Sequence, residues 1–374
     1  MLITFVASSL QNAELRTALA LASGPTAWRG PELAARQTDW ITELSNAEIE
    51  ELEATADASA DIPVEEITVK AFPLPTLAVK LRGIKQRLLC GPGVALLRTL
   101  PVEAWGTEKS ARALWLIGLH LGDTTPVPQN KAGHLLGHVY DLGCDPALPQ
   151  TRIYTTSIAQ PYHTDSADLV GLMCLRQAAA GGESQVVSSH AVFAELARTR
   201  PDLASELLST KTVWDRKGEV PLGCEPWFEV RAFEVNPSGT RLCAGLFDRS
   251  FVDAAQARFS AADGVPRLSP RLREALDEAE RLAADERLVL RMRLREGDVQ
   301  LLHSHHTWHA RSAFEDDDAA PRHLLRLWLS PGRADAWELP PDYANRYGTV
   351  VAGAVRGGVR CPGVRPYVPL TPYG

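Results

Sequence analysis

The chain has 374 residues, 45% of them hydrophobic and 23% charged, which is the composition of an ordinary globular protein. A formal net charge of −7 at pH 7 argues against nucleic-acid binding, because neutralising phosphates requires a basic surface. No apolar run approaches the ~20 residues that a membrane helix needs, so we expect no membrane partner.

Six cysteines are scattered along the chain without a C-x-x-C pair, which excludes a disulfide scaffold and a thiolate zinc site. The first residues, MLITFVASSLQNAELR, have no basic residue before their short apolar run and make a poor signal peptide. We therefore expect a cytoplasmic protein with reduced thiols, mostly in the core. The sequence leaves open whether the protein is a homo-oligomer.

The N-terminal part of the chain is predicted to be helical. Residues 1–60 are expected to form a helical extension packed on the core, with a surface helix in NAEIEELEATADASAD. Residues 61–374 are expected to form the main domain. Within it, apolar side chains at helical spacing predict a helix over 107–121. The Pro- and Gly-punctuated stretch 125–150 is predicted to be a loop, in which NKAGHLLGHVYD could form a short strand or a lid.

From residue 152 onward the pattern changes to short β-like runs. Two helices are expected near 189–197 and 201–208, and the clearest helix covers 269–286, with its apolar side chains on one face. Several short strands with few helices between them predict an antiparallel sandwich or barrel. The expected fold is mainly β with helical insertions around a jelly-roll core. The strands are predicted at 152–160, 162–176, 184–188, 227–235, 241–248, 288–306 and 322–330.

The stretch PYHTDSAD, residues 161–168, places His163 and Asp165 two positions apart. On a strand, alternate side chains point to the same side, so both groups can reach one point above the sheet. A divalent metal at that point would be held by one nitrogen and one oxygen. The motif alone also fits a histidine hydrogen-bonded to a nearby carboxylate.

A second stretch, LLHSHHTWHARSAF, contains four of the ten histidines: His303, His305, His306 and His309. Such a cluster at a strand end is a candidate source of metal ligands. One further histidine beside His163 and Asp165 would complete the facial triad of non-haem iron(II) oxygenases. The remaining histidines would be structural or exposed, and the cluster does not decide which ones contribute.

The strand-like run RHLLRLWL separates into two faces. His323 and three leucines share one face, which is expected to be core, and Arg322 and Arg326 share the other with a leucine and a tryptophan. These apolar neighbours favour a cavity over solvent for the arginine face. Because arginine binds carboxylates through a two-pronged fork, the run indicates anionic substrates or cosubstrates.

Together these motifs resemble the TauD/TfdA-type iron(II)- and 2-oxoglutarate-dependent dioxygenases, a branch of the clavaminate-synthase-like group. YHTDSADLVGLMCLR, GGES, WHARSAF and RHLLRLWLS occur in the family's order within residues 150–330, and AWRGPEL and PVPQNKAGHLLGHV are also similar. The resemblance implies a double-stranded β-helix core of the cupin-like type.

The resemblance also implies roles for individual residues. His163, Asp165 and His309 match the iron ligands of the family. Relatives often have asparagines before the distal histidine, so the choice of His309 over His306 rests on the H-A-R context and on the spacing to Arg322, 13 positions later.

The same comparison with the family implies a cosubstrate site and a substrate contact. Arg322 matches the arginine that grips the far carboxylate of 2-oxoglutarate, and Ser184 lies where relatives place a residue that helps to hold it. Arg326 lies near the position that meets the substrate in relatives with anionic substrates. We therefore expect a small substrate that carries a carboxylate or another anion.

The implied activity is hydroxylation of an unactivated C–H bond, with Fe(II), 2-oxoglutarate and O2, and with release of succinate and CO2. Asp165 argues against halogenation, because halogenating relatives replace this carboxylate with a small residue. Desaturation, cyclisation or dealkylation at the same iron stay open. A cupin-like metal-binding protein without dioxygenase activity is a further alternative, and Arg322 with Ser184 argues against it. An interaction module with incidental histidines also stays open, and the absence of any bound metal after gel filtration would favour it.

Overall fold

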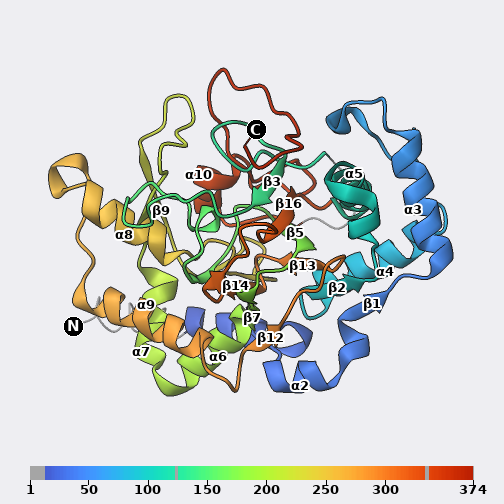
Figure 1. Ribbon diagram of the computed structural model, residues 1–374. Coiled ribbons are helices and arrows are strands. Elements are labelled where there is room, and N and C mark those ends of the chain that lie inside the picture. Colours follow the sequence, from blue (N-terminus) through green and yellow to red (C-terminus); the bar gives the residue numbers. More distant parts are fainter. Residues whose placement is uncertain (1–12, 123–124, 333–336, 374) are drawn as a thin grey trace, which may run out of the picture.

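The computed structural model describes residues 13–122, 125–332 and 337–373, and two β-sheets form its centre (Figure 1). The larger sheet has the strand order β1-β2-β13-β5-β16-β3. Its strands pair antiparallel, except that β1 runs parallel to β2. The bounds are β1 (Ile41–Glu43), β2 (Val94–Arg98), β13 (Val299–His303), β5 (Leu169–Arg176), β16 (His323–Leu329) and β3 (Leu136–Val139).

The smaller sheet has four antiparallel strands in the order β12-β7-β14-β4. Apolar side chains of both sheets, among them Leu172 and Leu324 of the larger and Val186 and Leu290 of the smaller, form one buried cluster. The two sheets therefore face each other. The bounds are β12 (Leu290–Met292), β7 (Ser184–Ser188), β14 (Thr307–Arg311) and β4 (Gln160–His163).

Three two-stranded ribbons complete the β structure in the described residues. They pair β8 with β9, β10 with β11 and β6 with β15. Their bounds are β8 (Thr212–Asp215), β9 (Trp227–Val230), β10 (Glu234–Val235), β11 (Leu242–Cys243), β6 (Ala180–Gly181) and β15 (Phe314–Glu315).

Helices cover the outer faces of both sheets (Figure 1). Helix α5 lies against β16, where a Cβ atom on Gly118 would come within 2.7 Å of Leu327 Cδ1, so the glycine permits the close approach. On the other side, α6, α7 and α9 pack together over Val187 and Trp308 of the smaller sheet. The bounds are α2 (Gly30–Ala35), α3 (Asn46–Ala58), α4 (Leu77–Cys90), α5 (Val102–Gly122), α6 (Ser189–Thr199), α7 (Pro201–Ser209), α8 (Arg249–Arg258), α9 (Pro270–Ala283) and α10 (Ala344–Tyr347).

Several predicted elements are confirmed, and others need correction. The helices near 46, 107, 189, 201 and 269 are present, and the last begins at a serine cap, Ser269. The strand predicted at 152–160 is wrong. The Thr155 and Thr156 hydroxyls donate to the carbonyls of Arg152 and Ile153, and these local bonds close a 3-10 turn instead. The two facing sheets are consistent with the expected jelly-roll core, and helices cover both of them, so helices form a larger part of the fold than predicted.

The predicted division near residue 60 stays a prediction, and residues 1–12 lie outside the described residues. Strand β1, within the first 60 residues, pairs with β2 of the main sheet. All six cysteines are free, but Cys90, Cys144 and Cys224 are exposed, so the expectation of mostly buried thiols is wrong.

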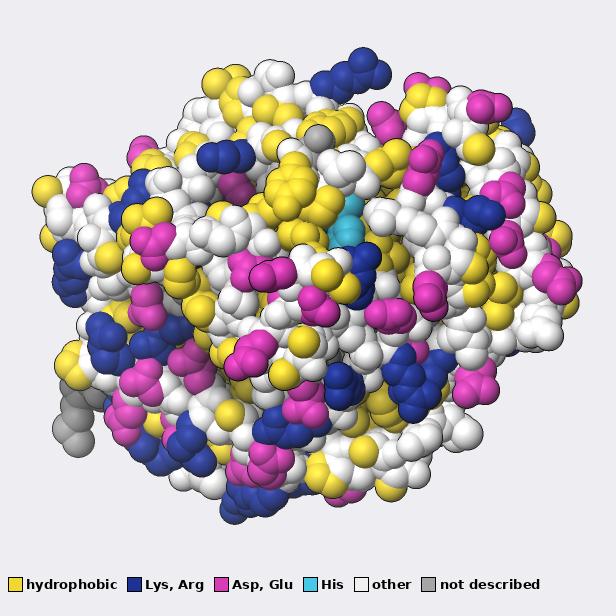
Figure 2. Space-filling model, viewed as in Figure 1, with side chains coloured by type: hydrophobic (Ala, Val, Ile, Leu, Met, Phe, Trp, Pro, Cys, Tyr) yellow, Lys and Arg dark blue, Asp and Glu magenta, His cyan; other side chains and the backbone are white. Residues whose placement is uncertain are grey.

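The visible surface carries positive and negative side chains intermingled, without a large area of one sign (Figure 2). Among the described residues, no helix combines the length and apolarity needed to cross a bilayer.

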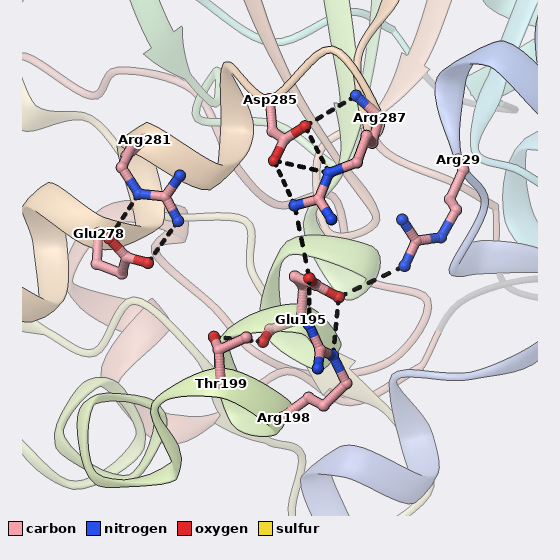
Figure 3. Close-up of polar contacts among 8 residues, drawn as sticks. All are labelled: Arg29, Glu195, Arg198, Thr199, Glu278, Arg281, Asp285 and Arg287. Carbon is pink, nitrogen blue, oxygen red and sulfur yellow. Dashed lines mark hydrogen bonds and ion pairs between the residues drawn. The ribbon is translucent and has the colours of Figure 1, made fainter.

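An ion-pair network ties α6 to its surroundings (Figure 3). The Glu195 carboxylate of α6, only 5% exposed, lies 3.4 Å from Arg29, 2.8 Å from Arg198 and 3.7 Å from Arg287. It thus connects α6 to the segment before α2 and to the turn between α9 and β12. The hydrogen bond from Arg198 is the main reason why the pKa of Glu195 lies below its usual value.

Replacing Glu195 by glutamine removes the carboxylate of these ion pairs and is expected to lower the free energy of unfolding by about 1 kcal/mol at neutral pH. The loss is this small because the guanidinium partners are largely exposed. A carboxylate with a lowered pKa stabilises the fold above its unfolded pKa and loses this contribution as pH falls through its folded pKa. The gap between wild type and E195Q, measured by urea unfolding, should therefore close as pH falls below 4.5. The control E278Q breaks an exposed pair within α9 and should change little. A gap that is constant with pH would contradict the assignment.

Candidate active site

Two histidines face each other on adjacent strands of the smaller sheet. His163 ends β4 and pairs in register with His309 of β14, and the centroids of their rings lie 4.1 Å apart. Asp165 lies in the loop after β4, not on the strand as predicted. This loop is fixed by Thr164, whose N–H donates to the Phe247 carbonyl at 2.8 Å and whose hydroxyl accepts from the Phe247 N–H at 3.0 Å.

The Asp165 carboxylate has one bound and one free oxygen. Oδ1 accepts from Arg326 Nη1 at 3.1 Å, whereas Oδ2 is buried without a hydrogen-bond partner in the described chain and lies 3.9 Å from His309 Nε2. Burial would raise the pKa of Asp165, but Arg326 and the two histidines outweigh it and hold the pKa below its usual value. Burial lowers the pKa of His309 to about 3, so its ring is neutral at physiological pH. Both groups are in the states that bind metal.

His163 has the tautomer that a metal ligand needs. Its Nδ1–H donates to the Pro161 carbonyl at 2.9 Å, which leaves the lone pair of Nε2 available. In the structure Nε2 accepts from the Gln160 amide at 2.9 Å. Within the described ranges no three His, Cys, Asp or Glu side chains already converge on a metal position. The three residues fit a metal once that amide contact is exchanged for it.

A cavity beside His309 contains the predicted cosubstrate residues. Arg322 is 6% exposed, and its Nη1 has no partner in the described part of the chain. Gly182, with φ of +70°, passes so close that an added Cβ would lie 3.1 Å from Arg322 Nε. Ser184 Oγ accepts from Gln300 Nε2 at 2.8 Å. The cavity is lined mainly by Ser184, Gln300, His309, Arg311, Arg322 and Leu324.

Arg311 is a cavity residue that sequence reasoning did not assign. It shares a strand face with His309, two positions earlier, so strand periodicity could have found it. Its Nη2 donates to the carbonyls of Thr156, at 2.9 Å, and Ile158. Burial and the nearby Arg322 lower the pKa of Arg311 to about 9. Two adjacent guanidinium groups in a buried cavity favour an anionic ligand.

Arg326 borders this cavity and a second one on the other side of His163. Besides Asp165, it contacts Gln129, whose Oε1 accepts from Arg326 Nε at 2.8 Å. Its role at the substrate stays a prediction, because in the structure its polar contacts are with the protein. The expected leucine face of β16 is buried, and Arg322 and Arg326 point into cavities.

The other three histidines of the cluster do not border either cavity. His303 and His306 stack with ring centroids 4.0 Å apart, and His303 also stacks on Trp337. His305 Nε2 lies 3.0 Å from Asp168, which is also held by Arg356. These histidines are buried packing residues, and the structure does not bring them to His163 and Asp165.

Comparison with known proteins decides the family. The family model described as "Taurine catabolism dioxygenase TauD, TfdA family" matches residues 58–328. The chain belongs to the TauD/TfdA family. It is therefore a 2-oxoglutarate-dependent non-haem iron dioxygenase acting on a small molecule, and the resemblance found in the sequence is confirmed.

Similar proteins include FR-33289 synthase of Streptomyces rubellomurinus, 31% identical over 317 residues that cover 82% of this chain and 90% of that protein. The uridine-5'-phosphate dioxygenase of an Amycolatopsis species is 30% identical over 189 residues, covering 48% of this chain and 65% of the relative.

Solved structures of similar fold include an asparagine oxygenase in complex with Fe(II), 3-hydroxyasparagine and succinate. It is 19% identical, covers 84% of this chain and 99% of its own, and has a TM-score of 0.57. The non-haem iron oxygenase OrfP in complex with Fe and alpha-ketoglutaric acid is 16% identical, with the same coverage and a TM-score of 0.56. These two likenesses support the fold.

Proposed function

We propose that this dioxygenase hydroxylates an unactivated C–H bond of a small anionic molecule in the cytoplasm, with release of succinate and CO2. The observation that carries the proposal is the free Oδ2 of Asp165, buried and facing His309 Nε2 beside the ring of His163. His163, Asp165 and His309 would hold Fe(II) on the wall of a double-stranded β-helix. Bound iron and 2-oxoglutarate supply the oxidising power by which O2 is divided between succinate and the substrate.

The protein's own residues have separate tasks in this proposal. Arg326 binds Oδ1 of Asp165 and so would leave Oδ2 to hold the metal. Arg322, helped by Ser184 and flanked by Arg311, would take the far carboxylate of 2-oxoglutarate, because its buried guanidinium offers an unused donor. Asp165 would itself supply a metal ligand where halogenating relatives have a small residue, so hydroxylation is favoured over halogenation.

The test is a titration of 2-oxoglutarate into the anaerobic protein loaded with Fe(II), recorded as a visible spectrum. Chelation of the keto acid should give a weak metal-to-ligand charge-transfer band in the wild type. The band should be lost in His163→Ala, which removes a strand-held ligand. If iron is bound and no band forms in the wild type, the site does not chelate a keto acid and the proposal is wrong.

A further inference from the structure

The second cavity lies on the other side of His163 from the cavity that contains Arg322. In this second cavity, three cationic side chains gather around one aromatic ring. Arg152, Lys217 and Arg346 lie 4.7, 4.8 and 5.8 Å from the centroid of the Phe251 ring. All three cations border the cavity, which also contains His163 and Asp165. They come from distant parts of the chain, and their mutual repulsion has to be offset by negative charge.

The protein supplies only part of that negative charge. Glu219, 4% exposed, is shared by Arg152 and Arg346, with its Oε2 3.0 Å from Arg346 Nη2. Asp248 also borders the cavity, but its Oδ1 accepts from the Ser250 N–H at 2.8 Å and from the Ser250 hydroxyl at 2.6 Å. Arg326 and Asp165, which also border the cavity, pair with each other, so three further cations face two carboxylates, Glu219 and Asp248.

Lys217 is the least compensated of the three cations. It is 7% exposed, and its Nζ donates to Ser250 Oγ at 3.3 Å, while no carboxylate of the described chain lies within 4.0 Å of it. Burial lowers the pKa of the Lys217 ammonium. A buried ammonium without a direct ion pair is costly even with Asp248, Asp215 and Glu219 at longer range, which points to an anion from outside the protein.

The backbone holds Lys217 in this place at a conformational cost. Lys217 and Gly218 have φ of +50° and +83°, and the Glu219 N–H donates to the Arg216 carbonyl at 2.9 Å, which closes a tight turn. A left-handed lysine is uncommon, because the side chain crowds its own backbone. Asp215 fixes the turn by accepting from the Lys217 N–H at 2.8 Å.

We propose that this cavity binds the substrate through a phosphonate or phosphate-ester group, placed between Lys217, Arg152 and Arg346. The inference rests on the proposed function, because it names the substrate class of the same iron site. An ammonium and two guanidinium groups offer donors from several directions, which suits a tetrahedral group with three oxygens better than a planar carboxylate. Facing three cations, a doubly charged group also gains more than a singly charged sulfonate.

The experiment uses the anaerobic Fe(II) and 2-oxoglutarate complex at mildly alkaline pH, where phosphonates carry two charges. Propylphosphonate, propyl phosphate, propanesulfonate and butanoate are each titrated by calorimetry, and the charge-transfer band is recorded alongside. Propylphosphonate or propyl phosphate should bind at least about 10-fold more tightly than the two singly charged probes. Whichever phosphorus probe binds more tightly identifies the substrate group as a phosphonate or as a phosphate ester. Equal or tighter binding of butanoate or propanesulfonate would overturn the proposal.

Lys217→Gln should weaken binding of the preferred probe by about 30-fold and should leave the charge-transfer band in place. Lys217→Arg keeps the charge and should restore part of the affinity. The matched control is Lys211→Gln, because Lys211 pairs with Asp342 away from the cavity and should not affect binding. Undiminished affinity in Lys217→Gln would overturn the proposal.

A missing band in the wild type would refute the iron and 2-oxoglutarate function itself. A normal band without binding of any phosphorus probe would refute only the substrate class.

Discussion

His309→Ala is expected to weaken iron binding by more than about 100-fold and to abolish turnover, whereas His306→Ala is expected to retain both. Loss of a residue that merely orients a metal ligand costs 10- to 100-fold, so loss of a ligand itself should cost more. His309 Nε2 faces the free oxygen of Asp165, while His306 stacks on His303 outside the cavities. Bound iron after gel filtration, together with succinate release, gives the measurement.

The comparison needs one further variant, because His306→Ala removes a buried ring and lowers stability. His134→Ala alters a more exposed histidine that contacts the Tyr367 hydroxyl, and it should behave like the wild type. Thermal unfolding of all three variants separates loss of fold from loss of metal. If His306→Ala loses iron while folded and His309→Ala keeps it, the distal ligand has been assigned to the wrong histidine.

Arg322→Ala is expected to raise the 2-oxoglutarate concentration for half-maximal activity by about 100-fold, with a much smaller change in the rate at saturation. Removing one partner of a buried, hydrogen-bonded charge pair costs about 3 kcal/mol, and each 1.4 kcal/mol is tenfold in affinity. Arg322→Lys should fall between, because lysine keeps the charge but loses the two-pronged geometry. Initial rates of succinate release over a range of 2-oxoglutarate concentrations provide the test.

Arg176→Ala is the matched control for this series. Arg176 is an exposed residue at the end of β5 and lines neither cavity. It donates to the carbonyl of Pro321, the residue that precedes Arg322. It should leave the 2-oxoglutarate dependence unchanged. The assignment of Arg322 fails if its alanine variant reaches half-maximal rate at the wild-type concentration.

The sequence predicted those parts of the site that are encoded in short motifs. His163 and Asp165 are two positions apart, and His309 and Arg322 are 13 positions apart, so their spacing was informative. Side chains alternate between the two faces of a strand, so the sequence likewise predicted that Arg322 and Arg326 face a cavity. The start of the helix predicted at 269 was encoded locally too, because Ser269 caps it in the structure.

Other features had no local pattern to reveal them. Arg152, Lys217 and Arg346 meet around Phe251 only through tertiary folding, and each is separated from the others by long stretches of chain. The wrong strand at 152–160 has a related cause, because threonine hydroxyls that suit a strand also bond to nearby carbonyls. Likewise, four histidines within seven positions were predicted to be one group of possible metal ligands. In the structure only His309 points towards the other candidate ligands.

The two cavities draw most of their walls from separate parts of the chain, and this division has a consequence for how the enzyme can change. The cavity beside His309 is built mainly by β7, β13, β14 and β16. The second cavity takes about half of its lining from residues 152–166 and adds the turn after β8, the start of α8 and α10. If the second cavity binds the substrate as proposed, mutations in the turn after β8, the start of α8 and α10 would change which molecule is oxidised while leaving the proposed iron and 2-oxoglutarate residues intact. New specificities should therefore be most accessible to laboratory evolution at positions 214–219 and 248–251.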